Sequence, residues 1–213
     1  MRPLAELRDL AVRAVEAAGE VVTGWRERDS ALETQSKGRG DYVTAADRAA
    51  EAAVLEVLAA GAVGAPFTGD LWCGARGLGA HDRRGRRLQV AGDGSGVVAT
   101  GFPFRRLENR DRYLRVFEAA FPEVEDLRRA GAASLDLAYS AQGAFDGYFE
   151  LGLSLWDVAA GSLLVLEAGG VVTDWAGDPR GVYRSGDVLA GSPAWHERML
   201  DIVRRAGSAR AVI

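Results

Sequence analysis

Acidic residues occur at three places where an element of the chain is expected to begin or end, the usual location of functional groups. Asp47 lies near the start of an expected helix, and Glu150 is the last residue of a strand-like segment. Asp157 directly precedes the apolar run Val158–Ala168. Carboxylate oxygens in such positions suit a hard cation such as Mg²⁺ or the hydroxyl groups of a small polar ligand.

Each of these acids also has an ordinary structural explanation. Asp157 can be a helix N-cap that accepts backbone N–H bonds, a role worth about 1 kcal/mol. Glu150 can be a solvated strand end, and Asp47 can be a first-turn acid that the helix dipole favours. Their positions alone leave the structural and the functional explanations open.

The composition limits which other groups can hold a metal. The single cysteine, Cys73, excludes an internal disulfide bond. The two histidines, His81 and His196, are too few and too far apart in sequence for a zinc site of His and Cys ligands. Any metal site must therefore be built from oxygen atoms.

Length and charge exclude several classes of protein. A chain of 213 residues with 48% hydrophobic and 26% charged residues is typical of a globular domain with a sizeable core. The net charge of −4 argues against nucleic acid as the main partner. No apolar stretch approaches the roughly 18 residues of a membrane span, and early charges interrupt any signal-peptide core. We expect a cytoplasmic protein without a membrane partner.

Hydrophobic spacing predicts helices and strands mixed along one domain. Apolar residues repeat about every 3.6 positions over Leu4–Trp25 and from Thr44 to Ala60, which predicts two amphipathic helices. Gly61–Phe67 and Leu71–Ala75 are expected to form a hairpin around Gly69. Further strands are expected at Leu88–Val90, Val97–Thr100, Phe145–Glu150, Val171–Trp175 and Asp187–Ala190. Further helices are expected at Asn109–Phe121, Ala133–Gln142, Val158–Ala168 and Ala194–Arg205. This mixture, without a strict βαβ rhythm, indicates a layered α/β or α+β fold.

Several motifs in this chain occur together and in a fixed order. They are Lys37-x3-Asp41-x-Val43-Thr44-x2-Asp47, Gly74-Ala-Arg-Gly77-x-Gly79-Ala80, Ala99-Thr-Gly101-Phe-Pro103, and a long run from Arg129 through Leu135-Asp136, Asp146-Gly147, Glu150 and Trp156-Asp157 to Glu167-Ala-Gly-Gly170. This set resembles the inositol monophosphatase family of Mg²⁺-dependent, lithium-sensitive sugar phosphatases. The resemblance implies a layered α-β-α-β-α fold for residues 1–213, with an N-terminal half of 1–108 and a C-terminal half of 109–213.

The resemblance also implies roles for individual residues. Asp157 matches a magnesium ligand, and Asp47 matches an acid that reaches a further magnesium through water. Thr44 matches a hydroxyl that helps to orient the attacking water, which makes Thr44 and Asp47 the expected catalytic residues. The expected substrate-binding residues are Gly131, Ala132, Ala133 and Glu150. By the same resemblance the substrate is a small polyol phosphate such as inositol 1-phosphate, and dimers are usual.

One part of the family pattern has no counterpart in this chain. Before the hairpin at Gly74, the family carries a Gly-Glu-Glu segment and an Asp-Pro-φ-Asp-Gly-Thr loop, which supply the main metal carboxylates and hold the phosphate. Here Ala60 runs directly through Gly61–Pro66 into the hairpin. We therefore expect weak Mg²⁺ binding. We also expect a first sheet, within residues 61–104, from which several of the family's strands are absent. Residues 109–205 are expected to be the better-packed half.

Three hypotheses about function follow. The first is a Mg²⁺-dependent phosphatase acting on a small polyol phosphate. The second is a catalytically impaired or inactive member of the family, a pseudoenzyme or partner-binding protein. The third is an internally deleted version of an ordinary enzyme. The missing ligands favour the second and the third. In each case we expect Asp157 and Glu150 to lie near one another at the mouth of a pocket shared with Gly131–Ala133, because a strand end and two helix starts converge there.

Overall fold

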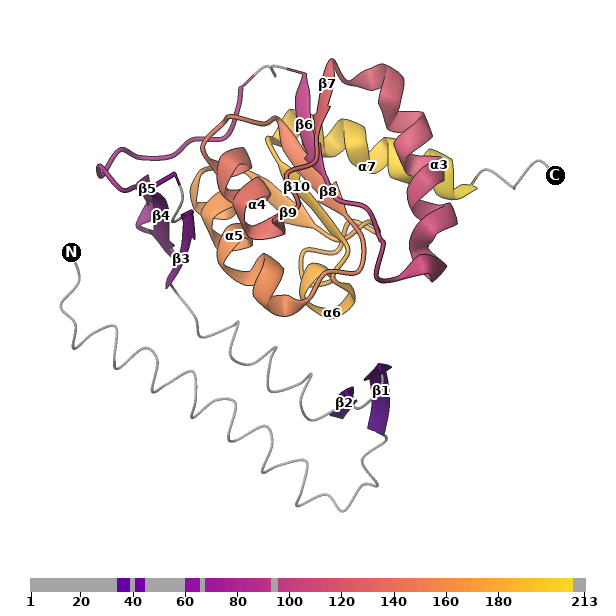
Figure 1. The fold of residues 1–213 in the computed structure, drawn as a ribbon. Helices are drawn as coiled ribbons and strands as arrows, with labels where there is room; N and C mark the ends of the chain where they lie inside the picture. The colour runs from indigo at the N-terminus through magenta and orange to yellow at the C-terminus, as the bar shows by residue number, and fades with distance from the viewer. Residues whose placement is uncertain (1–33, 39–40, 45–59, 66–67, 93–95, 209–213) are drawn as a thin grey trace. The chain divides into compact units, whose positions relative to one another are not determined.

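The computed structural model describes residues 34–38, 41–44, 60–65, 68–92 and 96–208 (Figure 1). The chain divides into two compact units, residues 1–59 and 60–213. In the first unit, β1 (Thr34–Gly38) and β2 (Asp41–Thr44) form an antiparallel pair. The two helices expected before residue 60 lie outside the described residues, apart from Thr44 and Ala60, which belong to strands.

The second unit begins with a three-stranded antiparallel sheet. Its strands are β3 (Ala60–Ala65), β4 (Asp70–Ala75) and β5 (Gly79–Asp82), in that spatial order. The predicted hairpin of β3 and β4 is confirmed by a continuous register from Ala60↔Ala75 to Ala65↔Asp70.

The strand predicted at Leu88–Val90 is wrong. The segment is irregular, and only the preceding Arg87 forms an isolated bridge, with His81. The reason lies in its backbone partners: the Leu88 N–H donates to Ala80 at 2.8 Å and the Val90 N–H donates to Ala168 at 3.2 Å. Single bonds to two different elements do not make a ladder with either of them.

A five-stranded mixed sheet forms the centre of this unit, in the order β7-β6-β8-β10-β9. The strands are β6 (Val97–Thr100), β7 (Asp126–Arg128), β8 (Gly147–Glu150), β9 (Val171–Thr173) and β10 (Val188–Gly191). Strand β6 is parallel to both β7 and β8, and β10 is antiparallel to β8 and β9. Because β6 belongs to this sheet, the strand-poor first sheet is confined to residues 60–82 and does not reach residue 104.

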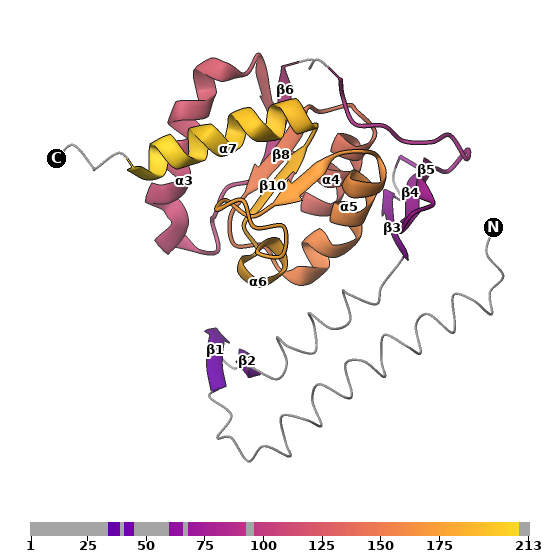
Figure 2. The same cartoon turned by 180° about the vertical axis from the view of Figure 1, so that it is seen from behind.

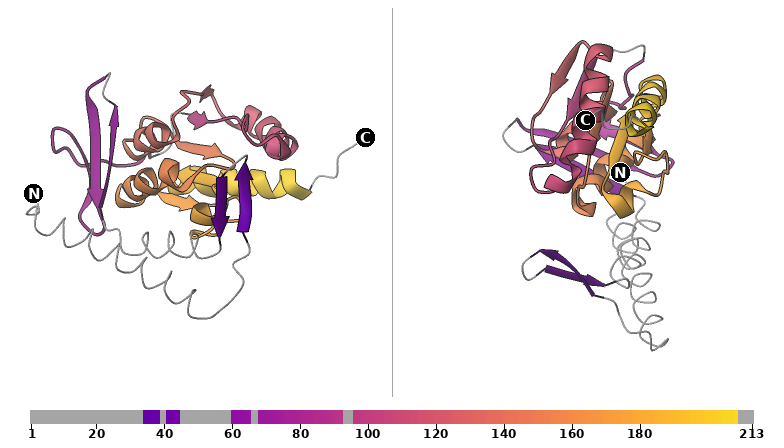
Figure 3. Two further views of the ribbon diagram at one scale, coloured as in Figure 1. Left: turned by 60° about the horizontal axis from the view of Figure 1, so that its bottom comes forward. Right: turned by 90° about the vertical axis from the view of Figure 1, so that its right-hand side faces the viewer.

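Helices cover both faces of the central sheet (Figures 1 and 2). They are α3 (Arg110–Ala120), α4 (Ala133–Ala141), α5 (Leu155–Glu167), α6 (Val182–Ser185) and α7 (Pro193–Ser208), with 3₁₀ turns at Leu107–Asn109 and Phe121–Glu123. Helices α4 and α5 lie between the two sheets, whereas α3 and α7 lie on the far face of the central sheet (Figure 3).

Successive side chains of the central strands point to opposite faces of the sheet, and this alternation divides the core in two. Ala99 and Tyr148 belong to the cluster that includes α4, α5 and the small sheet. Their neighbours Val98 and Phe149 point the other way, into the cluster with α3 and α7. The predicted layered mixed α/β class is confirmed. Within the described part of the chain, no helix combines the length and apolar character that crossing a membrane requires.

Candidate functional site

Glu150 lies at the carboxyl end of β8, beside the end of β6. The two strands are parallel, with Thr100 opposite Phe149, so the turn at Gly101 lies against the Glu150 side chain. A Cβ atom added to Gly101 would lie 1.9 Å from Glu150 Oε2, a separation that no side chain can adopt. The Ala99–Pro103 motif therefore has a glycine where the Glu150 carboxylate needs the space.

The Glu150 carboxylate is half-buried among polar groups. Burial raises the pKa of Glu150 above its ordinary value, and the negative charge of Asp157 acts in the same direction. The Tyr148 hydroxyl, which donates a hydrogen bond to Oε2, opposes this rise, as do the guanidinium groups of Arg129 and Arg105. Glu150 is thus a carboxylate with both acidic and basic neighbours.

Asp157 occupies the first turn of α5 but is not its N-cap. Ser154, with an extended backbone, is the N-cap, because Leu155 and Trp156 already belong to the helix. Asp157 is the third helical residue, and its Oδ2 accepts a hydrogen bond from the Ser154 N–H at 3.0 Å as part of a capping box. The prediction of Asp157 as the N-cap is therefore wrong by three positions. One oxygen of Asp157 already accepts a hydrogen bond within the helix start.

Asp187, a residue that the sequence analysis did not single out, holds the loop between Glu150 and Asp157. The Gly152 N–H donates to Asp187 Oδ1 at 3.2 Å. The other oxygen of Asp187 forms an ion pair with Arg112 at 2.6 Å, and the Arg112 guanidinium lies 5.0 Å from the centre of the Trp175 ring. Through these contacts, α3 and the start of β10 hold the loop that separates the two predicted site acids. The charge of Asp157 raises the pKa of Glu150, so the two acids lie within electrostatic range of each other, and the pocket expected beside them stays a prediction.

Gly131, Ala132 and Ala133 form the turn into α4. Gly131 has a φ of +90°, which favours glycine. Ala132 is the N-cap with extended backbone and gives no side-chain cap, and Ala133 begins the helix. The turn begins two residues after Arg129, whose charge acts on Glu150.

Asp136, in the first turn of α4, is a further acid of this neighbourhood. It is only 1% exposed, and its Oδ1 has no hydrogen-bond partner. Burial and then the charge of Glu150 raise the pKa of Asp136 to about 7, against the opposing effect of Arg129. Within its motif Asp136 is flanked by two leucines, but only the packing of α4 shows that its carboxyl group is buried near Glu150.

The two expected catalytic residues belong to the other unit. Thr44 is the last residue of β2, paired with Thr34. Asp47 lies outside the described residues. The roles of Thr44 and Asp47 stay predictions.

The acids of this neighbourhood do not fit a multi-carboxylate magnesium centre. Among the residues that the structure describes, no three His, Cys, Asp or Glu side chains are close enough together to hold a metal ion. One oxygen of Asp157 serves Ser154, and one oxygen of Glu150 serves Tyr148. Mg²⁺ requires near-octahedral oxygen coordination and gives up its water reluctantly, so an isolated carboxylate binds it weakly.

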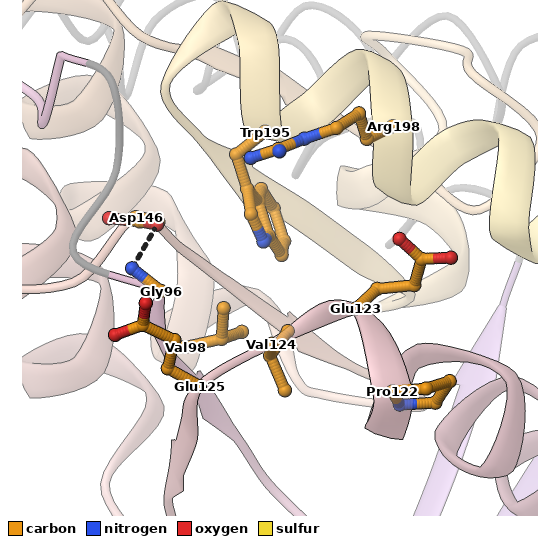
Figure 4. Close-up of a pocket in the computed structure, with 9 residues that line it drawn as sticks. All are labelled: Gly96, Val98, Pro122, Glu123, Val124, Glu125, Asp146, Trp195 and Arg198. Atoms are coloured by element: carbon orange, nitrogen blue, oxygen red, sulfur yellow. Dashed lines mark hydrogen bonds between the residues drawn. The ribbon is translucent and has the colours of Figure 1, made fainter.

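A cavity of about 290 Å³ lies at the end of the central sheet where β6 and β8 begin, opposite to the end at Glu150 (Figure 4). Gly96 and Asp146, which directly precede β6 and β8, form part of its lining, and the Gly96 N–H donates to Asp146 Oδ2 at 2.9 Å. Because β6 and β8 are parallel, this cavity and Glu150 are at opposite ends of the same two strands. None of the predicted site residues lines it.

Known proteins resemble this chain over nearly its whole length. Nus factor SuhB of Vibrio cholerae is 30% identical over an alignment that covers 94% of this chain and 96% of that protein. The native structure of the extragenic suppressor protein suhB from Bartonella henselae matches with 27% identity, a TM-score of 0.66, and coverage of 94% of this chain and 99% of that one. A second structure of the Bartonella protein matches over 68% of this chain and 58% of its own length, with 35% identity and a TM-score of 0.60. The inositol monophosphatase of Anabaena matches with 28% identity, a TM-score of 0.61, and coverage of 95% and 96%.

The alignment with the Vibrio protein also measures what this chain lacks. It runs over 258 positions but includes only 94% of the 213 residues of the chain, so more than 50 of its positions have no residue here. The sequence model of the inositol monophosphatase family matches residues 56–208. The match includes both sheets of the second unit and every helix described there. The chain therefore belongs to the inositol monophosphatase family.

Proposed function

We propose that this chain binds a small polyol phosphate at the Glu150 site and that its hydrolysis of the phosphate ester is strongly impaired. The observation that carries the proposal is a contrast within one neighbourhood. The charges of Arg105, Arg129 and Asp136 interact with that of Glu150 at the carboxyl end of β8, and the predicted Gly131–Ala133 turn lies between Arg129 and Asp136 in the chain. The acids of the described residues, in contrast, do not assemble a metal centre.

The binding part of the proposal rests on Glu150. Its carboxylate is partly accessible and has the acceptor oxygens that sugar hydroxyl groups need. Gly101 leaves room for it, and the Tyr148 hydroxyl holds one of its oxygens in place. A half-buried, oriented acceptor of this kind discriminates between hydroxyl-bearing ligands and others, because an unpaired carboxylate in such a place is costly.

The impaired hydrolysis follows from the ligand count. Metal-dependent phosphate hydrolysis needs one cation to activate water and others to hold the phosphate and the leaving oxygen. In the second unit, Asp157 would be the residue left to hold Mg²⁺, which would supply the activated water, and the role of Asp47 stays a prediction. Loss of a single preorganised electrostatic element commonly costs about 3–4 kcal/mol, or two to three decades of rate, and several are missing here.

The full family activity is the second candidate. It is favoured by the proximity of Glu150 and Asp157, and by the likeness to a solved structure that is named an inositol monophosphatase. On this candidate the chain hydrolyses inositol 1-phosphate with Mg²⁺.

One titration with product analysis separates the two candidates. Inositol 1-phosphate is titrated into the whole chain in Mg²⁺ buffer by calorimetry, and the ligand is then recovered and analysed for free phosphate. We expect saturable binding, an intact ester, and affinity lowered about tenfold or more by Glu150→Gln, as for the loss of a hydrogen bond to a charged group. Arg128→Gln, on an exposed residue paired with Asp126, serves as the control. Absence of binding would contradict the proposal, and quantitative release of phosphate would favour the second candidate.

A further inference from the structure

Two arginines reach the Glu150 site from separate loops. Arg105 follows the Gly101 turn after β6, and Arg129 directly follows β7. Strands β7, β6 and β8 are adjacent and parallel, so both loops leave the sheet at the edge where β8 ends in Glu150. The positive charges of both arginines act to lower the pKa of Glu150, in agreement with the two loops leaving the sheet at this end.

Neither arginine is held by an ion pair in the part of the chain that the structure describes. Their neighbours differ in this respect, since Arg128 pairs with Asp126 and Arg110 pairs with Asp111. Instead, the Arg129 guanidinium lies over the ring of Phe104 at 5.6 Å, and that ring is 68% exposed. A guanidinium that stacks on an aromatic ring keeps its N–H donors for an anion, because stacking uses its face and leaves its edge.

We propose that Arg105 and Arg129 bind the phosphate group of a polyol phosphate directly, while Glu150 accepts hydrogen bonds from hydroxyl groups of the same ligand. This inference rests on the proposed function and adds how the phosphate is recognised without a metal centre. Guanidinium groups bind phosphate oxygens through paired N–H donors, which gives both attraction and orientation. The ligand class is a phosphate monoester whose hydroxyl groups lie within one small molecule's reach of the phosphate.

The arrangement also has a competing explanation within the protein. The two arginines could serve only to offset the negative charges of Glu150 and Asp136, since Arg129 lowers the pKa of both carboxyl groups. In that case their loss changes the state of Glu150 and weakens every ligand that Glu150 binds. A direct phosphate contact instead weakens only the ligands that carry a phosphate.

The test is a calorimetric titration in EDTA with two probes, inositol 1-phosphate and myo-inositol. The wild-type chain is expected to bind inositol 1-phosphate about tenfold or more tightly than myo-inositol without any metal. Arg129→Gln and Arg105→Gln are each expected to lower the affinity for inositol 1-phosphate about tenfold, with less than about a twofold change for myo-inositol. Arg129→Lys keeps the charge but loses the paired donors, so its affinity for inositol 1-phosphate should lie between those of the wild-type chain and Arg129→Gln. Arg128→Gln is the matched control and should leave both affinities unchanged. Thermal unfolding of each variant shows that it is folded.

The outcomes separate this inference from the proposed function. Equal weakening of both probes by Arg129→Gln overturns the direct phosphate contact and leaves the Glu150 site in place. Binding of inositol 1-phosphate that EDTA abolishes and Mg²⁺ restores overturns it in favour of a metal. If the wild-type chain binds neither probe with or without Mg²⁺, the proposed function fails, and this inference fails with it.

Discussion

Glu167, the last residue of α5, accepts a hydrogen bond from the backbone N–H of Gly77 at 2.8 Å, in the turn between β4 and β5. Its second oxygen accepts from the Gly79 N–H at 2.9 Å. The carboxylate thereby joins the Gly74–Ala80 motif of the small sheet to the Glu167–Gly170 motif at the end of α5. One side chain thus links two motifs that are far apart in the sequence.

Glu167→Ala should loosen the small sheet before the rest of the unit. Two charge-assisted bonds are lost, one of them exposed, so we expect a cost of about 1–3 kcal/mol. Hydrogen exchange is the measurement, with faster exchange expected over residues 70–82 and little change over residues 147–150. Glu197→Ala, at an exposed position on α7, is the control. An equal change in both strand regions would contradict a local role for Glu167.

The wild-type small sheet should itself open more readily than the central sheet. It has three strands, and the few buried residues among them, such as Val63, Trp72 and Ala80, all belong to one core cluster. Sub-global opening favours such poorly supported elements. Hydrogen exchange that is slower over residues 60–82 than over residues 133–190 would contradict this expectation.

Gly101→Ala should weaken polyol phosphate binding without unfolding the chain. The added Cβ would meet the Glu150 carboxylate, which is the accessible end of a side chain and has to move aside. We expect the affinity for inositol 1-phosphate to fall about tenfold, as when a charged hydrogen-bond acceptor is displaced. Gly64→Ala is the matched control, because its Cβ would lie 3.7 Å from the nearest atom, in ordinary contact. Unchanged affinity in Gly101→Ala would show that the position of Glu150 is not critical.

Asp136→Asn should make stability less dependent on pH. Burial raises the pKa of Asp136 from its ordinary value of 3.8 to about 7 in the folded chain, so the folded state binds the proton more tightly than the unfolded state. The stability linked to this group is therefore full below about pH 4 and is lost as the pH rises to 7. The melting temperature of Asp136→Asn relative to wild type should rise over that range.

Asp111→Asn provides the control of opposite sign for this experiment. Its hydrogen bond and ion pair with the exposed Arg110 lower the pKa of Asp111, so its smaller contribution is present at neutral pH and is lost in acid. Melting curves continued below pH 4, where the Asp111 contribution is lost, test Asp111→Asn, and curves from pH 4 to 7 test Asp136→Asn. A relative melting temperature of Asp136→Asn that stays flat over this range would show that Asp136 is ionised throughout.

The longer elements of the second unit could be predicted from the sequence because their own periodicity defines them. The helices α3, α4, α5 and α7 all lie within a few residues of the predicted ranges. The elements that were missed, β7 and α6, have only three or four residues, too few to show a period, and β5 was indicated only by the Gly74–Ala80 hairpin motif. Tertiary contacts alone define them.

In the candidate site, too, the sequence does not predict the residues whose role depends on tertiary contacts. Glu150 and Asp157 could be found because they terminate or begin regular elements inside a recognisable motif. Asp136 and Asp187 could not, since their importance comes from burial and from a contact with Gly152 across the fold. Local sequence also placed the start of α5 too late, because it does not distinguish an acid at the N-cap from one in the first turn.

The proposed function combines polyol phosphate binding at Glu150 with strongly impaired metal-dependent hydrolysis. A steady-state assay of phosphate release from inositol 1-phosphate by the purified chain, with Mg²⁺ and with or without Li⁺, is the decisive measurement. We predict no Mg²⁺-dependent, Li⁺-inhibited release above background, and recovery only when a family metal segment is restored between Ala60 and Val63. Robust turnover by the chain as it stands, abolished by Asp157→Asn, would contradict the account.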